Sequence, residues 1–142
     1  IRAAAGLGVA PSEPDPDHYA NHFVHCDVLV IGGGAAGLSA ALAAAHAGAE
    51  VILCDEQAET GGAFHHETDA VLDGKAGLDW AQAVTSELRA MDNVRVLTRT
   101  TAFGYQAQNH VALLERVTEH LANPDLSLPR ERLWQVRAKQ VV

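Results

Sequence analysis

The sequence predicts an α/β fold in which helices cover a parallel sheet and antiparallel strands follow the third parallel strand. Three observations support this fold class. Apolar runs at residues 28–31 and 51–54 flank an alanine-rich segment at 35–47, which is the order strand, helix, strand. An amphipathic segment at 76–90 and a third apolar run at 94–97 extend this order to βαβαβ. Beyond the third run, apolar and polar residues alternate, as they do in antiparallel strands.

The composition is that of a globular protein of about one domain, with 142 residues, 48% of them apolar and 20% charged. The formal net charge is −8, so the chain has no electrostatic reason to bind nucleic acid or an anionic membrane. No apolar segment approaches the roughly 20 residues of a membrane helix, and no secretory signal is visible. These features predict a cytoplasmic protein that does not contact membranes.

The first apolar run leads directly into the motif Gly32-x-Gly34-x-x-Gly37. Gly32 permits a tight turn out of the strand, and Gly34 lets the backbone approach a pyrophosphate. Gly37 lets the following helix pack closely on the strand that it leaves. We expect the free N–H groups of the first helical turn, which includes Ala35 and Ala36, to face phosphate charge.

An acidic residue stands where a dinucleotide site needs one. Asp55 lies 18 residues beyond Gly37, at the end of the second strand, and Glu56 follows it. A carboxylate there can accept hydrogen bonds from the adenosine ribose hydroxyls and would repel a 2′-phosphate. The pair Gly61-Gly62 would let the backbone lie against the cofactor, with an ordinary loop turn as the alternative. Together with the glycine motif, these residues predict dinucleotide binding without any catalytic residue.

The histidines and cysteines predict neither a metal site nor a redox centre. Histidines occur at positions 18, 22 and 25 and again at 65 and 66, but no HExxH or CxxC spacing accompanies them. Cys26 and Cys54, the two cysteines of the chain, occupy apolar strand positions. We therefore predict that both are buried, unreactive thiols, which is consistent with a reducing compartment.

The ends of the chain differ from its centre. Residues 1–25 contain prolines alternating with acidic residues and predict an extended linker or lead-in. Residues 26–142 are predicted to form the dinucleotide-binding domain, with a turn at Gln108-Asn109 between two meander strands. Residues 138–142 are typical of one more buried parallel strand, so we expect a domain that is truncated at its C-terminus.

Residues 26–41, together with Asp55-Glu56 and Gly61-Gly62, resemble the first dinucleotide domain of the glutathione- and thioredoxin-reductase-like superfamily. The resemblance covers residues 26–142. It implies a Rossmann-like three-layer ββα domain that binds FAD or NAD(P), with a parallel sheet and an inserted antiparallel β-meander.

Three further segments, at residues 2–8, 11–17 and 99–105, extend the resemblance to the alpha-subunit family of heterotetrameric sarcosine oxidases. That resemblance implies an internal piece of a long chain, in an oxidoreductase that oxidatively demethylates sarcosine. It implies NAD in this domain, FMN between the alpha and beta subunits, FAD in the beta subunit, and gamma and delta subunits as further partners. It carries no catalytic residue onto this chain.

Two positions depart from the pattern of relatives. Ala35 stands where many have proline, and Asp55 replaces the glutamate that is usual in FAD-binding relatives, which favours NAD. Two alternatives stay open. One is the FAD-binding domain of another amine or amino-acid oxidoreductase, and the other is a structural nucleotide-binding scaffold for subunit assembly.

Overall fold

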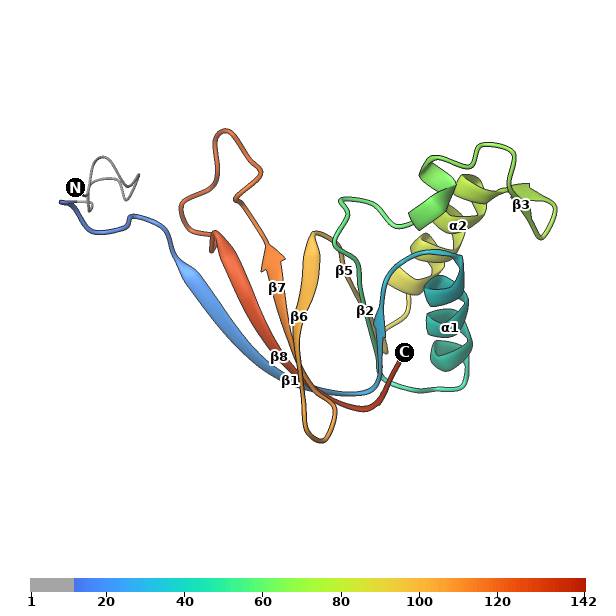
Figure 1. Ribbon diagram of the computed structural model, residues 1–142, viewed down its shortest axis with the longest axis horizontal. Helices are drawn as coiled ribbons and strands as arrows, with labels where there is room; N and C mark the ends of the chain where they lie inside the picture. Colours follow the sequence, from blue (N-terminus) through green and yellow to red (C-terminus); the bar gives the residue numbers. More distant parts are fainter. Residues whose placement is uncertain (1–11) are drawn as a thin grey trace, which may run out of the picture.

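The computed structural model describes residues 12–142, which form a three-layer α/β domain (Figure 1). Residues 2–8 and Pro11, which contribute to the resemblance and to the predicted linker, lie outside the described residues. The elements in chain order are β1 (Tyr19–Ile31), α1 (Ala35–His46), β2 (Val51–Cys54), the 3-10 helix η1 (Gly62–His65), β3 (Val71–Leu72), β4 (Lys75–Ala76), α2 (Gly77–Arg89), β5 (Val94–Leu97), β6 (Thr100–Gln106), β7 (His110–Arg116) and β8 (Glu131–Val141). The predicted fold class is confirmed.

The main sheet has six strands in the order β5-β2-β1-β8-β7-β6. Strands β5, β2, β1 and β8 run parallel to their neighbours, whereas β6, β7 and β8 form an antiparallel meander. Strand β8 belongs to both parts, because Glu131–Arg137 pair with β7 while Gln140 and Val141 pair with Val28 and Leu29 of β1. The parallel strand predicted at residues 138–142 is therefore the end of a longer strand whose first part also pairs with the meander. No glycine, proline or turn residue interrupts it.

Strand β1 begins at Tyr19, so it starts earlier than the sequence predicts. Residues 19–25, assigned to the lead-in by the sequence, pair in parallel with the first half of β8. His22 of this extension stacks on Trp134 with ring centroids 4.6 Å apart, and Val24 packs against the core beneath the meander. This one-sided packing holds the segment in the sheet despite its polar composition.

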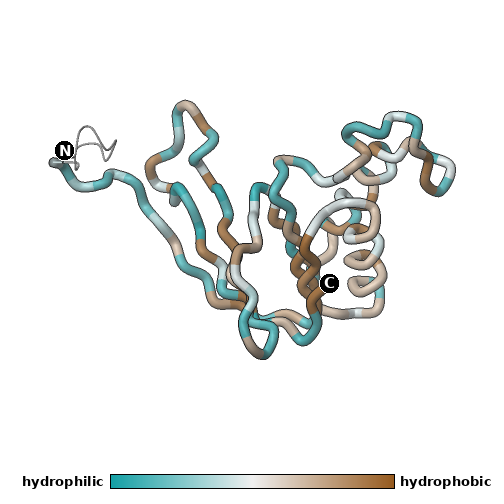
Figure 2. The backbone as a smooth tube through the Cα atoms, in the orientation of Figure 1, coloured by the Kyte–Doolittle hydropathy of each residue, from teal (hydrophilic) through white to brown (hydrophobic). Residues whose placement is uncertain are grey.

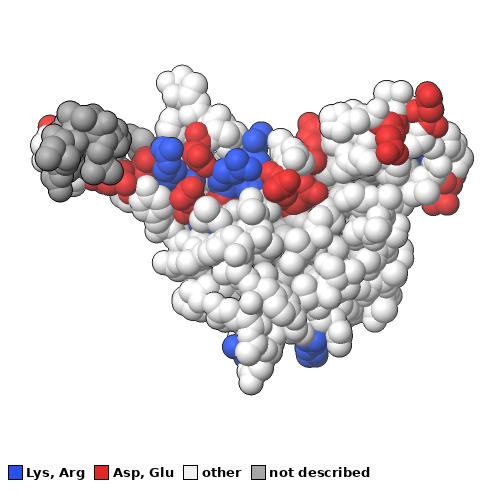
Figure 3. Space-filling model, in the orientation of Figure 1, with Lys and Arg blue, Asp and Glu red and all other residues white. Residues whose placement is uncertain are grey.

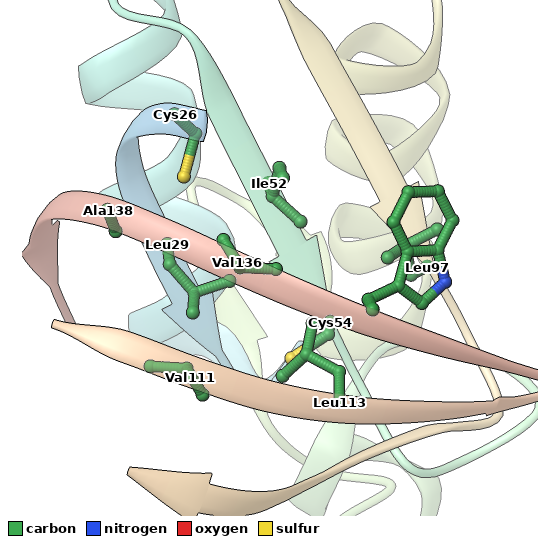
Figure 4. Packing of buried hydrophobic residues seen from close by; sticks show 10 residues of the cluster. Cys26, Leu29, Ile52, Cys54, Leu97, Val111, Leu113, Val136 and Ala138 are labelled. Atoms are coloured by element: carbon green, nitrogen blue, oxygen red, sulfur yellow. The ribbon is translucent and has the colours of Figure 1, made fainter. Parts of the chain in front are cut away.

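The alternation of side chains along the parallel strands creates two apolar layers. The layer between the parallel sheet and the meander contains Cys26, Leu29, Ile52, Cys54, Leu97, Val111, Leu113, Trp134, Val136 and Ala138, most of which Figure 4 labels. The layer under the helices contains Val30, Leu38, Ala41, Ala45, Val51, Leu53, Trp80, Ala81, Val84 and Leu88. Figure 2 shows the same concentration of hydrophobic residues on the central strands beside α1.

Both helices occur within one or two residues of their predicted bounds. α1 packs Leu38, Ala41 and Ala45 on the sheet, and its alanines allow a close approach. α2 is amphipathic and buries Trp80 and Leu88.

Two turns connect short strands. The predicted turn between β6 and β7 is present, with Gln108 and Asn109 at φ values of 62° and 51°. The hairpin of β3 and β4 was not predicted, although Asp73-Gly74 is a typical turn sequence and has φ values of 49° and 75°.

Neither helix of the described residues 12–142 has the length and apolar character needed to span a membrane.

Candidate functional site

The glycine turn after β1 has the geometry that its three motif glycines predict. Gly32 adopts φ 107° and its N–H donates to the Cys54 carbonyl oxygen at 2.8 Å, which ties the turn to β2. A Cβ on Gly37 would overlap the Gly32 carbonyl oxygen, so only glycine allows α1 to begin this close to the strand. Gly34 is the N-cap of α1 in an extended conformation, with no side-chain cap and no acidic residue in the first turn.

Asp55 is buried beside this turn, with 8% of its surface exposed. Its Oδ2 accepts a hydrogen bond from the Gly33 N–H at 2.5 Å, and its Oδ1 accepts one from the Gln57 N–H at 2.7 Å. The backbone of Asp55 is fixed as well. Its N–H donates to the Leu97 carbonyl oxygen, and the carbonyl oxygen of Asp55 accepts from the Thr100 N–H. The predicted acid is therefore held against the glycine turn by bonds on both sides.

Gly33 is a site residue that the sequence reasoning missed. A Cβ at this position would lie 2.8 Å from Cγ2 of Thr60 and 3.0 Å from Oδ2 of Asp55. The sequence did contain an indication of this role. The motif does not require glycine at the middle position of Gly32-Gly33-Gly34, so a glycine there suggests a close contact.

The second glycine pair packs on the first. Gly61 and Gly62 adopt φ values of 132° and 52°, which favour glycine. The Gly61 N–H donates to the Gly33 carbonyl oxygen at 2.8 Å, and a Cβ on Gly62 would lie 3.0 Å from the Cα of Gly34. At Gly61 and Gly62, the backbone of the second loop thus lies directly against the backbone of the glycine turn.

A cavity of about 720 Å³ opens at the carboxyl ends of β1 and β2, where parallel sheets bind their ligands. Its lining comprises Ile31, Gly32, Cys54, Asp55, Glu56, Gln57, Ala58, Glu59, Gly62, Ala63, His65, His66, Thr100, Thr101 and Ala102. Four predicted site residues, Gly32, Asp55, Glu56 and Gly62, are in this lining. The other five lie in the turn, the start of α1 or the second loop, outside the lining: Gly34, Ala35, Ala36, Gly37 and Gly61.

The cavity rim is acidic. Asp55, Glu56 and Glu59 line it, whereas the lining within residues 12–142 includes no lysine or arginine. Arg116 contacts the rim from outside, where its Nη2 donates to the Glu56 carbonyl oxygen at 3.1 Å. Figure 3 shows the charged side chains in a band across one side of the molecule and an adjoining surface with few charges. At this cavity, the donors available to a phosphate are backbone N–H groups and side chains such as Gln57 and Thr101, not lysine or arginine.

Both cysteines are buried, as predicted, and both are free thiols. Burial raises the pKa of Cys26 to about 11, and burial together with the neighbouring Asp55 charge raises the pKa of Cys54 to about 12. Within the described part of the chain, no three histidine, cysteine or acidic side chains are grouped closely enough to hold a metal ion.

Comparison with known proteins agrees with this geometry. Residues 27–133 match the family model described as FAD dependent oxidoreductase. The chain belongs to this family. Membership in the FAD dependent oxidoreductase family confirms the predicted class of enzyme and the dinucleotide-binding character of the domain.

Two curated relatives confirm the predicted resemblance to sarcosine oxidase alpha subunits. The chain is 52% identical to sarcosine oxidase subunit alpha of Rhizobium meliloti (strain 1021), over 97% of this chain. It is 44% identical to the subunit of the same name from Corynebacterium sp. (strain U-96), again over 97% of this chain. In both comparisons this chain spans 14% of the relative's length.

Solved structures show the same fold at low sequence identity. L-proline dehydrogenase from P. horikoshii superposes with a TM-score of 0.64 at 22% identity, covering 85% of this chain and 22% of that chain. Thioredoxin reductase from T. acidophilum gives a TM-score of 0.51 at 20% identity, over 82% of this chain and 34% of that chain. These likenesses concern the fold alone.

Proposed function

We propose that this chain is the dinucleotide-binding domain of a sarcosine oxidase alpha subunit and that its dinucleotide is NAD. The hydrogen bond between Gly33 and Asp55 carries the proposal, because it joins the glycine turn and the ribose-binding acid in one wall of the cavity. The identity of 52% to a sarcosine oxidase subunit alpha supports the choice of enzyme. The shorter side chain of Asp55, compared with glutamate, supports NAD.

The residues fit such a ligand. An added Cβ on Gly34 would meet only the Gly62 Cα, in ordinary van der Waals contact at 3.9 Å, so the protein's own packing does not require glycine at this position. The first turn of α1 has no acidic residue and no side-chain cap to compete with an anion. The site therefore offers backbone N–H groups and a helix N-terminus to a pyrophosphate.

The proposed contacts follow from this arrangement. Gly32, Gly34, Ala35 and Ala36 would hold the pyrophosphate with backbone N–H groups, and Gly37 would keep α1 close enough for this. These roles concern binding and orientation only. NAD, when bound, supplies hydride-transfer chemistry, and this chain contributes no acid, base or nucleophile to it.

The remaining predicted residues would contact the adenosine half of the ligand and its neighbourhood. Asp55 would accept hydrogen bonds from the ribose hydroxyls with the lone pairs that Gly33 and Gln57 leave free. Exposed Glu56 would add negative charge at the rim, which disfavours a 2′-phosphate. Gly61 and Gly62 would let the second loop lie against the cofactor.

FAD is the second candidate, and the match to the FAD dependent oxidoreductase family favours it. Both dinucleotides share the adenosine diphosphate portion that the glycine turn and Asp55 would bind. In the complete enzyme, beta, gamma and delta subunits would complete the assembly, and FMN and FAD would lie at sites with those partners. The substrate of that enzyme would be sarcosine.

Calorimetric titration of the full-length protein that contains this domain tests the proposal, with NAD, FAD and NADP as separate ligands. We expect saturable binding of NAD, and weaker binding of NADP because the acidic rim repels its extra phosphate. Binding of FAD without NAD would replace the first candidate by the second. Binding of none of the three would overturn both and would favour a structural scaffold.

A further inference from the structure

We propose that Thr60 and Thr85 are positioning residues for the dinucleotide, a role that rests on the proposed function. Through the hydrogen bond between their hydroxyl groups, this threonine pair fixes the second glycine loop against the glycine turn. Thr60 immediately precedes Gly61-Gly62, and Thr85 lies on α2. Neither residue belongs to the motifs from which dinucleotide binding was predicted.

The threonine pair is buried and its hydrogen bond has a defined direction. Thr60 and Thr85 are 5% and 7% exposed, and their Oγ1 atoms lie 2.6 Å apart. The Thr85 hydroxyl donates to the Ala81 carbonyl oxygen at 2.8 Å, which uses its single proton. Thr60 must therefore be the donor within the pair. The result is a chain of two hydrogen bonds that runs from the loop into α2.

The other contacts of Thr60 reach the site. Its Cγ2 occupies the space that a Cβ on Gly33 would need, at 2.8 Å, so the methyl group packs directly on the turn. Its carbonyl oxygen accepts a hydrogen bond from Nε2 of His65 at 3.1 Å. The next residue, Gly61, donates from its N–H to Gly33. Thr60 thus joins α2 to the turn that would bind the pyrophosphate.

The loop needs such an anchor because it has few other means of holding its position. Gly61 and Gly62 have no side chains, and glycine populates many backbone conformations when unconstrained. The two loops approach closely, since a Cβ on Gly62 would lie 3.0 Å from the Gly34 Cα. A small displacement at Thr60 would change the spacing over Gly34, where the ligand would lie. Preorganisation of this spacing would favour binding.

Three variants of the full-length protein test the role. Thr60→Val and Thr85→Val keep the side-chain shape and each remove the same hydrogen bond from opposite ends. Thr60→Ser keeps the hydroxyl group. Ser86→Ala is the matched control, because Ser86 follows Thr85 on α2 and makes a similar bond to the Gln82 carbonyl oxygen at 2.8 Å, but its side chain is exposed.

The readouts are the Kd for NAD, with FAD titrated in parallel, and the midpoint of urea unfolding. We expect each valine variant to weaken binding by up to about tenfold, because a less well preorganised loop must be ordered when the ligand binds. The Thr60→Val, Thr85→Val double variant should bind about as weakly as each single variant, because both substitutions remove the same hydrogen bond. Ser86→Ala should bind like the unmodified protein, and Thr60→Ser, which keeps the hydrogen bond but loses the methyl contact on the turn, should bind between the unmodified protein and Thr60→Val. Because the two valine variants act on one bond, either suffices if the other does not fold.

Unchanged affinity in a folded valine variant would overturn the positioning role while leaving the proposed function intact. Equal losses in Ser86→Ala and the valine variants would also overturn it, because the effect would then follow the helix and not the loop. If the unmodified protein binds neither NAD nor FAD, the proposed function fails first and the positioning role fails with it.

Discussion

The Gly33 N–H donates a 2.5 Å hydrogen bond to Oδ2 of Asp55, which lies 22 residues further along the chain. This bond joins the first strand's glycine turn to the end of the second strand. The same carboxylate also receives the Gln57 N–H, so the acid is oriented before any ligand arrives. A site organised in this way loses little conformational freedom on binding.

Replacing Asp55 by asparagine should weaken both the fold and the binding of the dinucleotide. The amide nitrogen of asparagine cannot accept a hydrogen bond, so one of the two backbone N–H groups would be left unpaired. We expect a loss of about 1–3 kcal/mol in the free energy of unfolding, together with weaker NAD binding. Urea denaturation measures the first effect. Glu56→Gln, at the exposed neighbouring position, is the control and should change stability by less than about 0.5 kcal/mol.

Alanine at Gly34 and at Gly37 should have opposite consequences. Gly34 has an ordinary φ of −76°, and a Cβ there would only touch the Gly62 Cα at 3.9 Å, so Gly34→Ala should fold normally and lose dinucleotide affinity. Gly37→Ala would place its Cβ on the Gly32 carbonyl oxygen, and should cost about 1–3 kcal/mol or more in stability. Thermal unfolding and calorimetry on both variants check this. Full NAD affinity in Gly34→Ala would contradict the proposed pyrophosphate position.

The two cysteines should be unreactive in the folded protein. Burial raises the pKa of Cys26 to about 11 and the pKa of Cys54 to about 12, above the ordinary value of 9.0, so the reactive thiolate is scarce near neutral pH. Labelling with a thiol reagent at pH 8 should be slow for both, and fast after unfolding in urea. Rapid labelling of the native protein at either site would contradict this picture of the core.

The same two thiols predict how stability depends on pH. Their pKa values are raised on folding, so the folded chain keeps protons that the unfolded chain releases above about pH 9. Their contribution to stability is fully present below that pH and decreases as pH rises toward 11 and 12. Denaturation of the Cys26→Ala, Cys54→Ala double variant at pH 8 and pH 10 gives the comparison. Its stability should fall less between the two pH values.

Loss of Glu115 should destabilise the meander. Its Oε2 accepts hydrogen bonds from Nε1 of Trp134 at 2.7 Å and from Nη1 of Arg132 at 3.0 Å. Glu115→Leu would leave the indole N–H of Trp134 without its partner beside the core, which should cost about 1–3 kcal/mol. Glu119→Leu, at an exposed position of the following loop, should be close to neutral in the same urea denaturation experiment.

The parts of the fold that local pattern determines were predictable from the sequence. The helices, the strands at 51–54 and 94–97, and the turn at Gln108-Asn109 all follow from spacing and turn chemistry. The early start of β1 was not predictable, because residues 19–25 are held by pairing with a strand that is distant in sequence. The double membership of β8 was missed for the same reason. Register between distant strands depends on tertiary packing, which periodicity does not report.

The candidate site likewise contains residues that a local motif predicts and residues whose importance appears only from tertiary contacts. Gly32, Gly37 and Asp55 follow from a motif whose spacing has a physical reason, and the structure gives them the expected geometry. Thr60 and Gly33 were missed because their importance arises from contact with residues elsewhere in the chain. A threonine before two glycines looks like an ordinary loop residue until α2 is seen to supply its partner.

The shared strand β8 also has a consequence for how the domain folds. β1 needs β8 along most of its length, yet β8 is the last element of the described chain to leave the ribosome. Until then, one edge of β1 stays unpaired while β2, α1 and α2 can already assemble on the other. Pairings this distant in sequence slow folding, and an open strand edge attracts other chains. The interval before β8 emerges should therefore be the time at which this domain is most prone to aggregate and most dependent on chaperones.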